Sequence, residues 1–362
     1  MRVSGRVVTP DGLLEPGWVE VDGDRISGVG AGGGGGPLIL PGFVDIHVHG
    51  GGGHTFTTGD PDEARAAAAF HARHGTTTLL ASLVSMAYES TLAATKAYAP
   101  LVDEGVLAGV HCEGPYLSLR RCGAQNPDYL RDPSIVELDG LVQAAPGTVR
   151  VVTLAPELTG AIDVIRWLRS VGIVVAVGHT DATYQQTLEA IEAGATIATH
   201  LFNGMRPIHH REPGPIIALL GDDRVTCELV ADGRHMHSAM LAYAMRAGRS
   251  ALITDAIQAA GMPDGVYALG GQRVIVVDRV ARLAGRDAIA GSTLTMDAAL
   301  RNATQAGASI VDASRMASGT PAEAIGLASS VGSIAAGLRA DLIELTDDLM
   351  VSRVMRGGRW LS

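Results

Sequence analysis

Eight short apolar runs, each followed by a helix-like or loop segment, constrain the fold of this chain more than any other feature. In chain order the runs are FVDIHVH (43–49), TTTLLAS (76–82), VLAGVHCE (106–113), VRVVTLAPE (149–157), GIVVAVGH (172–179), GATIATH (194–200), VTCELVAD (225–232) and SALITDA (250–256). Ala-rich amphipathic segments lie between many of them. Eight parallel strands with intervening helices form a (β/α)₈ barrel, which takes about 250 residues. The sequence of 362 residues therefore predicts an α/β chain with such a barrel over residues 41–337.

The two ends of the chain have a different pattern. Residues 1–40 and 338–362 contain short stretches in which apolar and polar residues alternate, such as WVEVDGDRISGVG and ADLIELTDDLMVSRVMRGGRW. Such alternation is typical of half-buried strands. The segment AGGGGGP, which follows the first stretch, is expected to be a flexible joint. We predict that both termini together build one small β-sandwich domain.

Charge and composition limit the possible partners. The formal net charge is −10, whereas nucleic acids and anionic membranes require a basic binding face. A small anionic substrate held by local donors is compatible with this charge. The N-terminus lacks the apolar core of a signal peptide, and no apolar run approaches membrane-spanning length, so we expect a cytoplasmic protein. Three cysteines in no zinc-finger spacing argue against a disulfide framework.

Potential metal ligands collect at the ends of the predicted strands. They are His47 and His49 in the first run, Glu113 in the third, His179 in the fifth, His200 in the sixth and Asp255 in the eighth. In a barrel the C-terminal strand ends open onto one face, so these side chains should converge. His47 and His49 are two residues apart and so lie on one side of their strand. Four imidazoles and two carboxylates suit Zn²⁺, Fe²⁺ or a similar ion, so we predict a centre with one or two metal ions.

Longer motifs carry a resemblance to a known family. PGFVDIHVHG, HCEGPYLS, VGHTDATY, THLFNGM, REPG, ADGRHMH, ITDAIQAAG and AGSTLTM occur in this order. The chain resembles the amidohydrolase superfamily and, through HCEGP, HLFNGM and ADGRH, its family of N-acetylglucosamine-6-phosphate deacetylases. This resemblance implies metal-dependent hydrolysis of the acetamide of N-acetyl-D-glucosamine 6-phosphate to D-glucosamine 6-phosphate and acetate. Such a reaction belongs to amino-sugar catabolism and the recycling of cell-wall sugars.

The resemblance also assigns roles at the metal centre. It implies that Glu113, His179 and His200 hold one ion, and that His47 and His49 hold a second with Glu113 as the bridge. Zn²⁺ or Fe²⁺ is the expected metal, with Mn²⁺ or Co²⁺ as alternatives. Asp255 matches the catalytic aspartate, which takes a proton from the attacking water and passes it to the leaving amine.

For the substrate, the resemblance implies contacts from several further residues. Asn203, Gly204, His235 and Arg211 are expected at the sugar and phosphate, with Arg211 reaching across the interface of a homodimer. Thr295 and Met296 of AGSTLTM are expected to shape the pocket wall. Gln125 stands where family members commonly carry a histidine that polarises the substrate carbonyl. Because glutamine donates a hydrogen bond but neither a proton nor a positive charge, rate or substrate preference could differ here.

Two other functions are also compatible with the overall pattern of the sequence. N-acetylgalactosamine 6-phosphate differs from the expected substrate in the configuration of one hydroxyl, which no motif distinguishes. A non-catalytic scaffold would lack ligands or the aspartate, and this chain has them all. Outside the site, we predict that His71 and His74 are exposed helix residues and that His209 and His210 are solvated. Cys122 is a candidate redox-sensitive thiol, although such cysteines are more often incidental.

Overall fold

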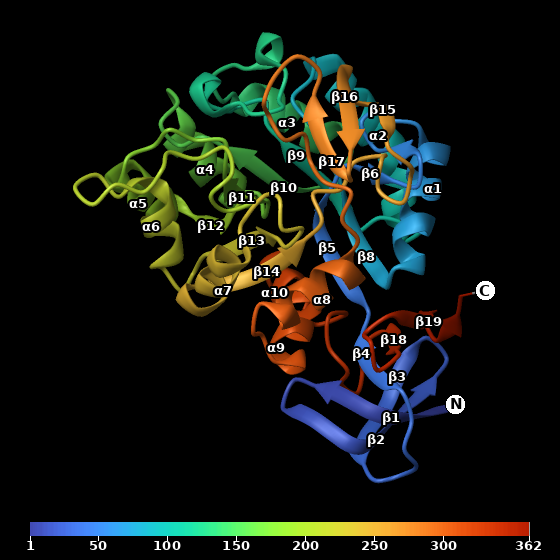
Figure 1. Cartoon of the computed structure of the whole chain (residues 1–362). Helices are drawn as coiled ribbons and strands as arrows, with labels where there is room; N and C mark the ends of the chain where they lie inside the picture. The colour runs from blue at the N-terminus through green and yellow to red at the C-terminus, as the bar shows by residue number, and fades with distance from the viewer. Residues whose placement is uncertain (362) are drawn as a thin grey trace.

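An eight-stranded parallel sheet forms the centre of the molecule and curls into a nearly closed barrel (Figure 1). The structure is a computed structural model that describes residues 1–361. The barrel strands are β5 (Phe43–Val48), β8 (Thr76–Leu83), β9 (Gly109–Glu113), β10 (Val149–Leu154), β11 (Val174–Val177), β12 (Ala195–Ala198), β13 (Thr226–Val230) and β14 (Arg249–Ile253). Asp255 follows β14, and its amide donates to the carbonyl of His47 in β5 (2.9 Å), which links the last strand to the first. The predicted barrel is confirmed.

The barrel strands are buried on both faces, which explains their continuous apolar runs. Every residue of β5 and β8 is buried, because helices cover the outside of the sheet and side chains fill the inside. Helix boundaries follow local signals. In α5, for example, Thr183 and Gln186 form a capping box. The helices are α1 (Pro61–Arg73), α2 (Tyr88–Asp103), α3 (Ile135–Ala144), α4 (Ala161–Ser170), α5 (Tyr184–Ala193), α6 (Gly214–Leu220), α7 (Ser238–Ala247), α8 (Met296–Gln305), α9 (Ile310–Ser314) and α10 (Thr320–Ala324).

The two ends of the chain meet in one seven-stranded sheet below the barrel (Figure 1). Strand β1 (Arg2–Thr9) pairs in parallel with β4 (Leu38–Pro41), and β4 pairs antiparallel with β18 (Leu342–Leu345). The C-terminal strands therefore extend the sheet of the N-terminal ones. This sheet buries a separate apolar cluster that includes Val7, Ile39 and Met355. In sheet order the strands are β20 (Arg359–Trp360), β19 (Val351–Arg356), β18 (Leu342–Leu345), β4 (Leu38–Pro41), β1 (Arg2–Thr9), β2 (Gly12–Asp22) and β3 (Arg25–Ala31).

Two smaller sheets lie outside the barrel and the terminal sheet. One consists of β15 (Gly265–Leu269), β16 (Gln272–Val277) and β17 (Val280–Leu283), inserted between β14 and α8. The other pairs β6 (Gly50–Gly51) with β7 (His54–Thr55), directly after the first barrel strand. Among residues 1–361, no helix has the length and apolar character that crossing a bilayer demands.

The prediction that His71 and His74 are exposed is wrong. On α1, His71 is fully buried and its Nε2 lies 2.9 Å from the carbonyl oxygen of Gly50. His74 is only partly exposed, and its Nδ1 lies 3.3 Å from Asp297 Oδ1. Burial lowers the pKa of His71 to about 4, so this imidazole is neutral near pH 7. Helical spacing alone could not indicate which face of α1 packs against the short strand after the barrel run.

Candidate active site

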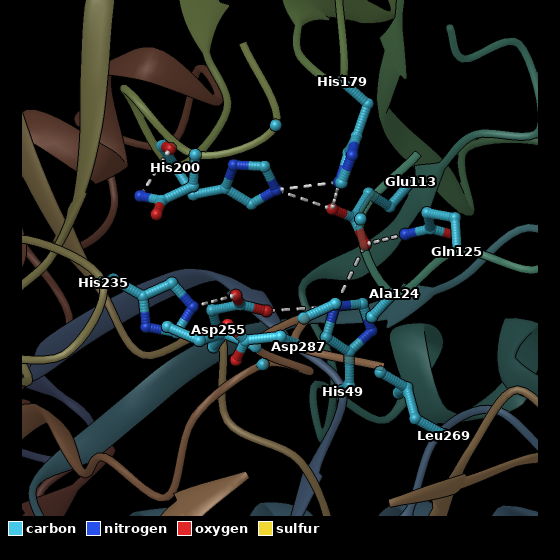
Figure 2. Close-up of a pocket in the computed structure, with 16 residues that line it drawn as sticks. His49, Glu113, Ala124, Gln125, His179, His200, His235, Asp255, Leu269 and Asp287 are labelled. Atoms are coloured by element: carbon cyan, nitrogen blue, oxygen red, sulfur yellow. Dashed lines mark hydrogen bonds and ion pairs between the residues drawn. The ribbon is translucent and has the colours of Figure 1, made fainter. Parts of the chain in front are cut away.

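The six predicted ligands converge at the C-terminal ends of the barrel strands and form two adjoining groups. One group is Glu113, His179 and His200, and the other is His47, His49 and Asp255. Within each group the potential ligand atoms lie within 4.8 Å of one another, and all six residues are buried. Figure 2 shows five of these side chains pointing toward one another around a pocket. Each group has the donor set and spacing to hold a divalent ion.

Glu113 lies between the two groups. Its Oε1 is 3.1 Å from His179 Nε2 and 2.9 Å from His200 Nε2. Its Oε2 is 3.2 Å from His49 Nε2. Burial raises the pKa of this carboxyl, but the nearby positive charge of His47 and hydrogen bonds from the other histidines outweigh that effect and hold the pKa well below its usual range. An ionised carboxylate in this position can contact an ion in either group.

The remaining ring nitrogens of three of the histidines test whether a metal fits. Nδ1 of His47 lies 3.0 Å from Glu228 Oε2, Nδ1 of His49 lies 3.1 Å from the Ser82 carbonyl, and Nδ1 of His179 lies 2.8 Å from the Arg121 carbonyl. Because carbonyls and carboxylates only accept, these contacts keep a proton on Nδ1, so each ring in its neutral, metal-binding form has its lone pair on Nε2.

The Nε2 atoms face each other in pairs. They are 3.2 Å apart between His47 and His49, and 3.1 Å apart between His179 and His200. In the neutral forms of His47 and His49, the two facing lone pairs repel at this distance unless a proton or cation lies beside them. The side chains present therefore fit a metal centre.

The backbone is strained where the ligands leave their strands. His179, His200 and Asp255 have φ values of 46°, 28° and 49°, in the left-handed region that residues with a Cβ rarely adopt. Such conformations cost of order 1–3 kcal/mol each and persist where the surrounding structure imposes them, often at functional sites. The turns after these strands thus hold the side chains over the barrel mouth.

A cavity of about 310 Å³ opens above the two groups and contains several of the predicted substrate residues. Asn203, Gly204, His235 and Gln125 line it. Gly204 has φ +60°, and a Cβ there would lie 2.7 Å from His179 Nδ1, so this position requires glycine. The lining also includes Leu269 of β15, which brings the inserted sheet to the cavity.

The other predicted substrate residues lie outside this cavity. Thr295 and Met296 are not among its lining residues: Met296 begins α8 and is fully buried, and Gly291 lines the wall. Arg211 lies on an exposed loop, where its guanidinium contacts His210 (2.8 Å). The prediction that it reaches the site of a partner subunit remains a prediction.

Gln125 faces the bridging glutamate. Its Nε2 donates to Glu113 Oε2 (2.6 Å), and its Oε1 accepts from the Ser85 amide (2.7 Å). The side chain is buried, so these two bonds determine its orientation. The amide therefore supports the carboxylate while lining the cavity.

Sequence reasoning missed two carboxylates behind the ligands. Glu228 of β13 accepts from His47 Nδ1 and from the His200 amide (3.1 Å). Asp232 Oδ2 lies 2.7 Å from His235 Nδ1, and His235 Nε2 lies 3.5 Å from Asp255 Oδ2. Although burial lowers the pKa of His235, its bond to Asp232 raises it above the usual value. For Glu228 the available signal was a charged residue inside the apolar run VTCELV, and for Asp232 it was a carboxylate at the end of the run VTCELVAD.

A nearly closed barrel with two adjoining histidine–carboxylate groups at its C-terminal face has the architecture of a barrel hydrolase that uses divalent metal. The chain belongs to the amidohydrolase family, whose model matches residues 38–361. It is 40 % identical to N-acetylgalactosamine-6-phosphate deacetylase of Escherichia coli O157:H7 over 90 % of this chain and 88 % of that protein.

Solved structures are similar over the whole chain. An N-acetyl-D-glucosamine-6-phosphate deacetylase mutant from Mycobacterium smegmatis, in complex with N-acetyl-D-glucosamine-6-phosphate, is 47 % identical with a TM-score of 0.97, covering 99 % of this chain and 98 % of that one. The N-acetylglucosamine-6-phosphate deacetylase of Thermotoga maritima is 32 % identical with a TM-score of 0.93, covering 99 % of each chain. The resemblance predicted from the motifs is confirmed.

Proposed function

We propose that this chain hydrolyses the acetamide of N-acetyl-D-glucosamine 6-phosphate to D-glucosamine 6-phosphate and acetate. The observation that carries the proposal is the position of Asp255, whose Oδ1 lies 3.3 Å from His49 Nε2 at the floor of the cavity. A carboxylate beside the metal ligands and open to the substrate can move a proton during amide cleavage. The relatives named as deacetylases of amino-sugar phosphates agree with this reaction.

The metal would be held by Glu113, His179 and His200, with His47 and His49 available for a second ion. A divalent ion bound there lowers the pKa of water toward 7 and polarises the acetamide carbonyl. We propose Zn²⁺ or Fe²⁺, with Mn²⁺ or Co²⁺ as alternatives, because imidazole and carboxylate ligands accept all four.

The residues of the chain itself then orient the substrate and move protons. Asp255 accepts a proton from the attacking water at a carboxylate oxygen and delivers it to the leaving nitrogen. His235, held by Asp232, faces the other oxygen of Asp255 and can donate to a sugar hydroxyl. Asn203 and the backbone at Gly204 line the side of the cavity where we place the sugar phosphate.

An acetate-release assay on both epimers tests this function. We expect metal-loaded protein to release acetate from N-acetylglucosamine 6-phosphate with a higher kcat/KM than from N-acetylgalactosamine 6-phosphate. The 47 % identity to the Mycobacterium smegmatis enzyme, against 40 % to the galactosamine enzyme, favours this order. Chelation should remove the activity, and added Zn²⁺, Fe²⁺, Mn²⁺ or Co²⁺ should restore it. Full activity without metal would contradict the mechanism, and a preference for the galactosamine substrate would reassign the specificity.

We further propose that the enzyme is a cytoplasmic homodimer in which Arg211 contacts the phosphate bound to the partner subunit. Arg211 is exposed and outside its own cavity, and a guanidinium binds phosphate through two hydrogen bonds. Mixing Asp255→Asn with Arg211→Ala subunits should restore about a quarter of wild-type activity, since half the dimers are mixed and each has one intact site. Activity no higher than the mean of the two separate mutants would refute the shared site.

A further inference from the structure

A second cavity lies at the opposite end of the barrel, where the barrel meets the terminal sheet. Its volume is about 190 Å³. The start of β8 (Thr77), the start of β10 (Arg150) and the turn after α2 (Gly105) line its barrel side. Arg339 and Arg356, from the C-terminal part of the chain, line its other side. Because β8 begins here and ends near His49, this cavity is separate from the proposed active site.

Three arginines surround this cavity, and only one of them is paired with a carboxylate among the described residues. Arg339 forms an ion pair with Asp341 and donates to Thr78 Oγ1 (2.7 Å). Within residues 1–361, neither Arg150 nor Arg356 has a carboxylate within ion-pair distance. Arg356 donates instead to the Gly105 carbonyl (2.5 Å). Three guanidinium charges and one carboxylate charge leave a net +2 around the cavity, in a chain whose formal net charge is −10.

Two polar groups of the lining residues are buried without partners. They are the Nε–H group of Arg150 and the hydroxyl of Thr77, a residue that is 2 % exposed. Burial and the positive charge of nearby Arg339 both lower the pKa of Arg356, which indicates a positive local potential. Buried donors are normally satisfied by protein, water or a bound ion.

A third cavity in the molecule also contains arginines but differs in its charge balance. Arg249 there forms an ion pair with Glu323, and Arg315 lies 3.8 Å from Asp312, whereas Arg246 has no carboxylate of the described residues within ion-pair distance. None of its lining residues has a buried side-chain atom without a hydrogen-bond partner in the described part of the chain. Of these two arginine-lined cavities, only the one between the barrel and the terminal sheet combines uncompensated charge with unpartnered donors among residues 1–361.

We propose that the cavity lined by Arg150, Arg339 and Arg356 binds a tetrahedral oxyanion, with phosphate as the ligand. Guanidinium groups bind phosphate oxygens through forked, charge-assisted hydrogen bonds, and several of them can share one ion. A volume of 190 Å³ equals about six waters at 30 Å³ each, enough for phosphate and a few waters. Bound there, the ion joins the terminal sheet to the barrel. It is either free phosphate or the phosphate group of an ester.

Equilibrium dialysis of the metal-loaded full chain with radiolabelled inorganic phosphate, at constant ionic strength, tests the site. We expect wild-type protein to bind one phosphate more per subunit than Arg356→Gln or Arg150→Gln, whose affinity at this site should fall at least about tenfold. Arg359→Gln is the matched control, since Arg359 is exposed on the same hairpin and does not line the cavity. The proposed active site contributes equally in all four proteins.

Several outcomes decide the proposal. Both cavity variants should retain acetate release, which reports that they fold. If Arg356→Gln does not fold, Arg150→Gln decides alone, because its guanidinium makes only a 3.4 Å contact with the Ala108 carbonyl. Equal phosphate stoichiometry in all folded proteins would overturn the site. Displacement of the additional phosphate by methyl phosphate would support an ester ligand, whereas displacement by sulfate alone would support free oxyanion.

Discussion

Glu228 is the residue whose replacement tests most directly how the barrel interior orients the metal ligands. Its side chain is 1 % exposed, and Oε2 accepts from both His47 Nδ1 (3.0 Å) and the His200 amide (3.1 Å). Glu228→Ala leaves two buried donors without partners. Each costs about 1–3 kcal/mol, so we expect a loss of about 2–6 kcal/mol in the free energy of unfolding of the metal-free protein.

Glu228→Gln removes the negative charge of the side chain but nearly keeps its size and shape. The amide oxygen can still accept a hydrogen bond, but it no longer stabilises the Nδ1–H form of His47 through its charge. Replacing a residue that hydrogen-bonds to a metal-binding histidine typically weakens metal binding by about 10–100-fold, or about 1.4–2.7 kcal/mol. We therefore expect Kd for Zn²⁺ to rise about tenfold in Glu228→Gln and about a hundredfold in Glu228→Ala.

Titration in metal buffers, with metal content measured by mass spectrometry, provides the Kd values. Glu192→Gln is the control, because Glu192 is an exposed carboxylate paired with Arg224 on the surface. Excess metal should restore most of the turnover of Glu228→Gln. Wild-type metal affinity in a folded Glu228→Ala protein would refute the reasoning that this buried carboxylate prepares His47 for the metal.

Three further predictions follow from the same geometry. Asp255→Asn should lower kcat by at least about a hundredfold with little change in KM, and a loss below tenfold in steady-state kinetics would reassign its role. The pKa of His71 falls from 6.5 to about 4 on folding, so its stabilising effect is complete above pH 6.5 and is lost as the pH falls toward 4. The stability difference between wild type and His71→Gln should therefore change by about 2 kcal/mol between pH 7 and pH 5; a constant difference in unfolding midpoints would contradict it. Gln125→His should keep or raise turnover if the side chain polarises the substrate carbonyl, whereas a large loss would indicate that its bond to Glu113 dominates.

Much of this architecture could be predicted from the sequence. Parallel strands buried on both faces appear as continuous apolar runs, so eight such runs indicated the barrel. The predicted ligands lie at or near the ends of these runs, and barrel topology brings the strand ends together. This is why His47, His49, Glu113, His179 and Asp255 could be grouped although more than 200 residues separate the first from the last.

Other features depended on packing between distant segments, which no local pattern records. His71 is buried because α1 lies against the Gly50–Gly51 strand, although its helical spacing was equally compatible with exposure. Glu228 was hidden inside an apolar run because its partner, His47, is 181 residues away. The cavity between the barrel and the terminal sheet likewise exists only because the chain ends fold back beneath the barrel, which brings Arg356 next to the turn at Gly105. The sequence by itself determined which residues form strands and which end them, whereas tertiary packing decided which charged and polar groups are removed from water and therefore need a partner.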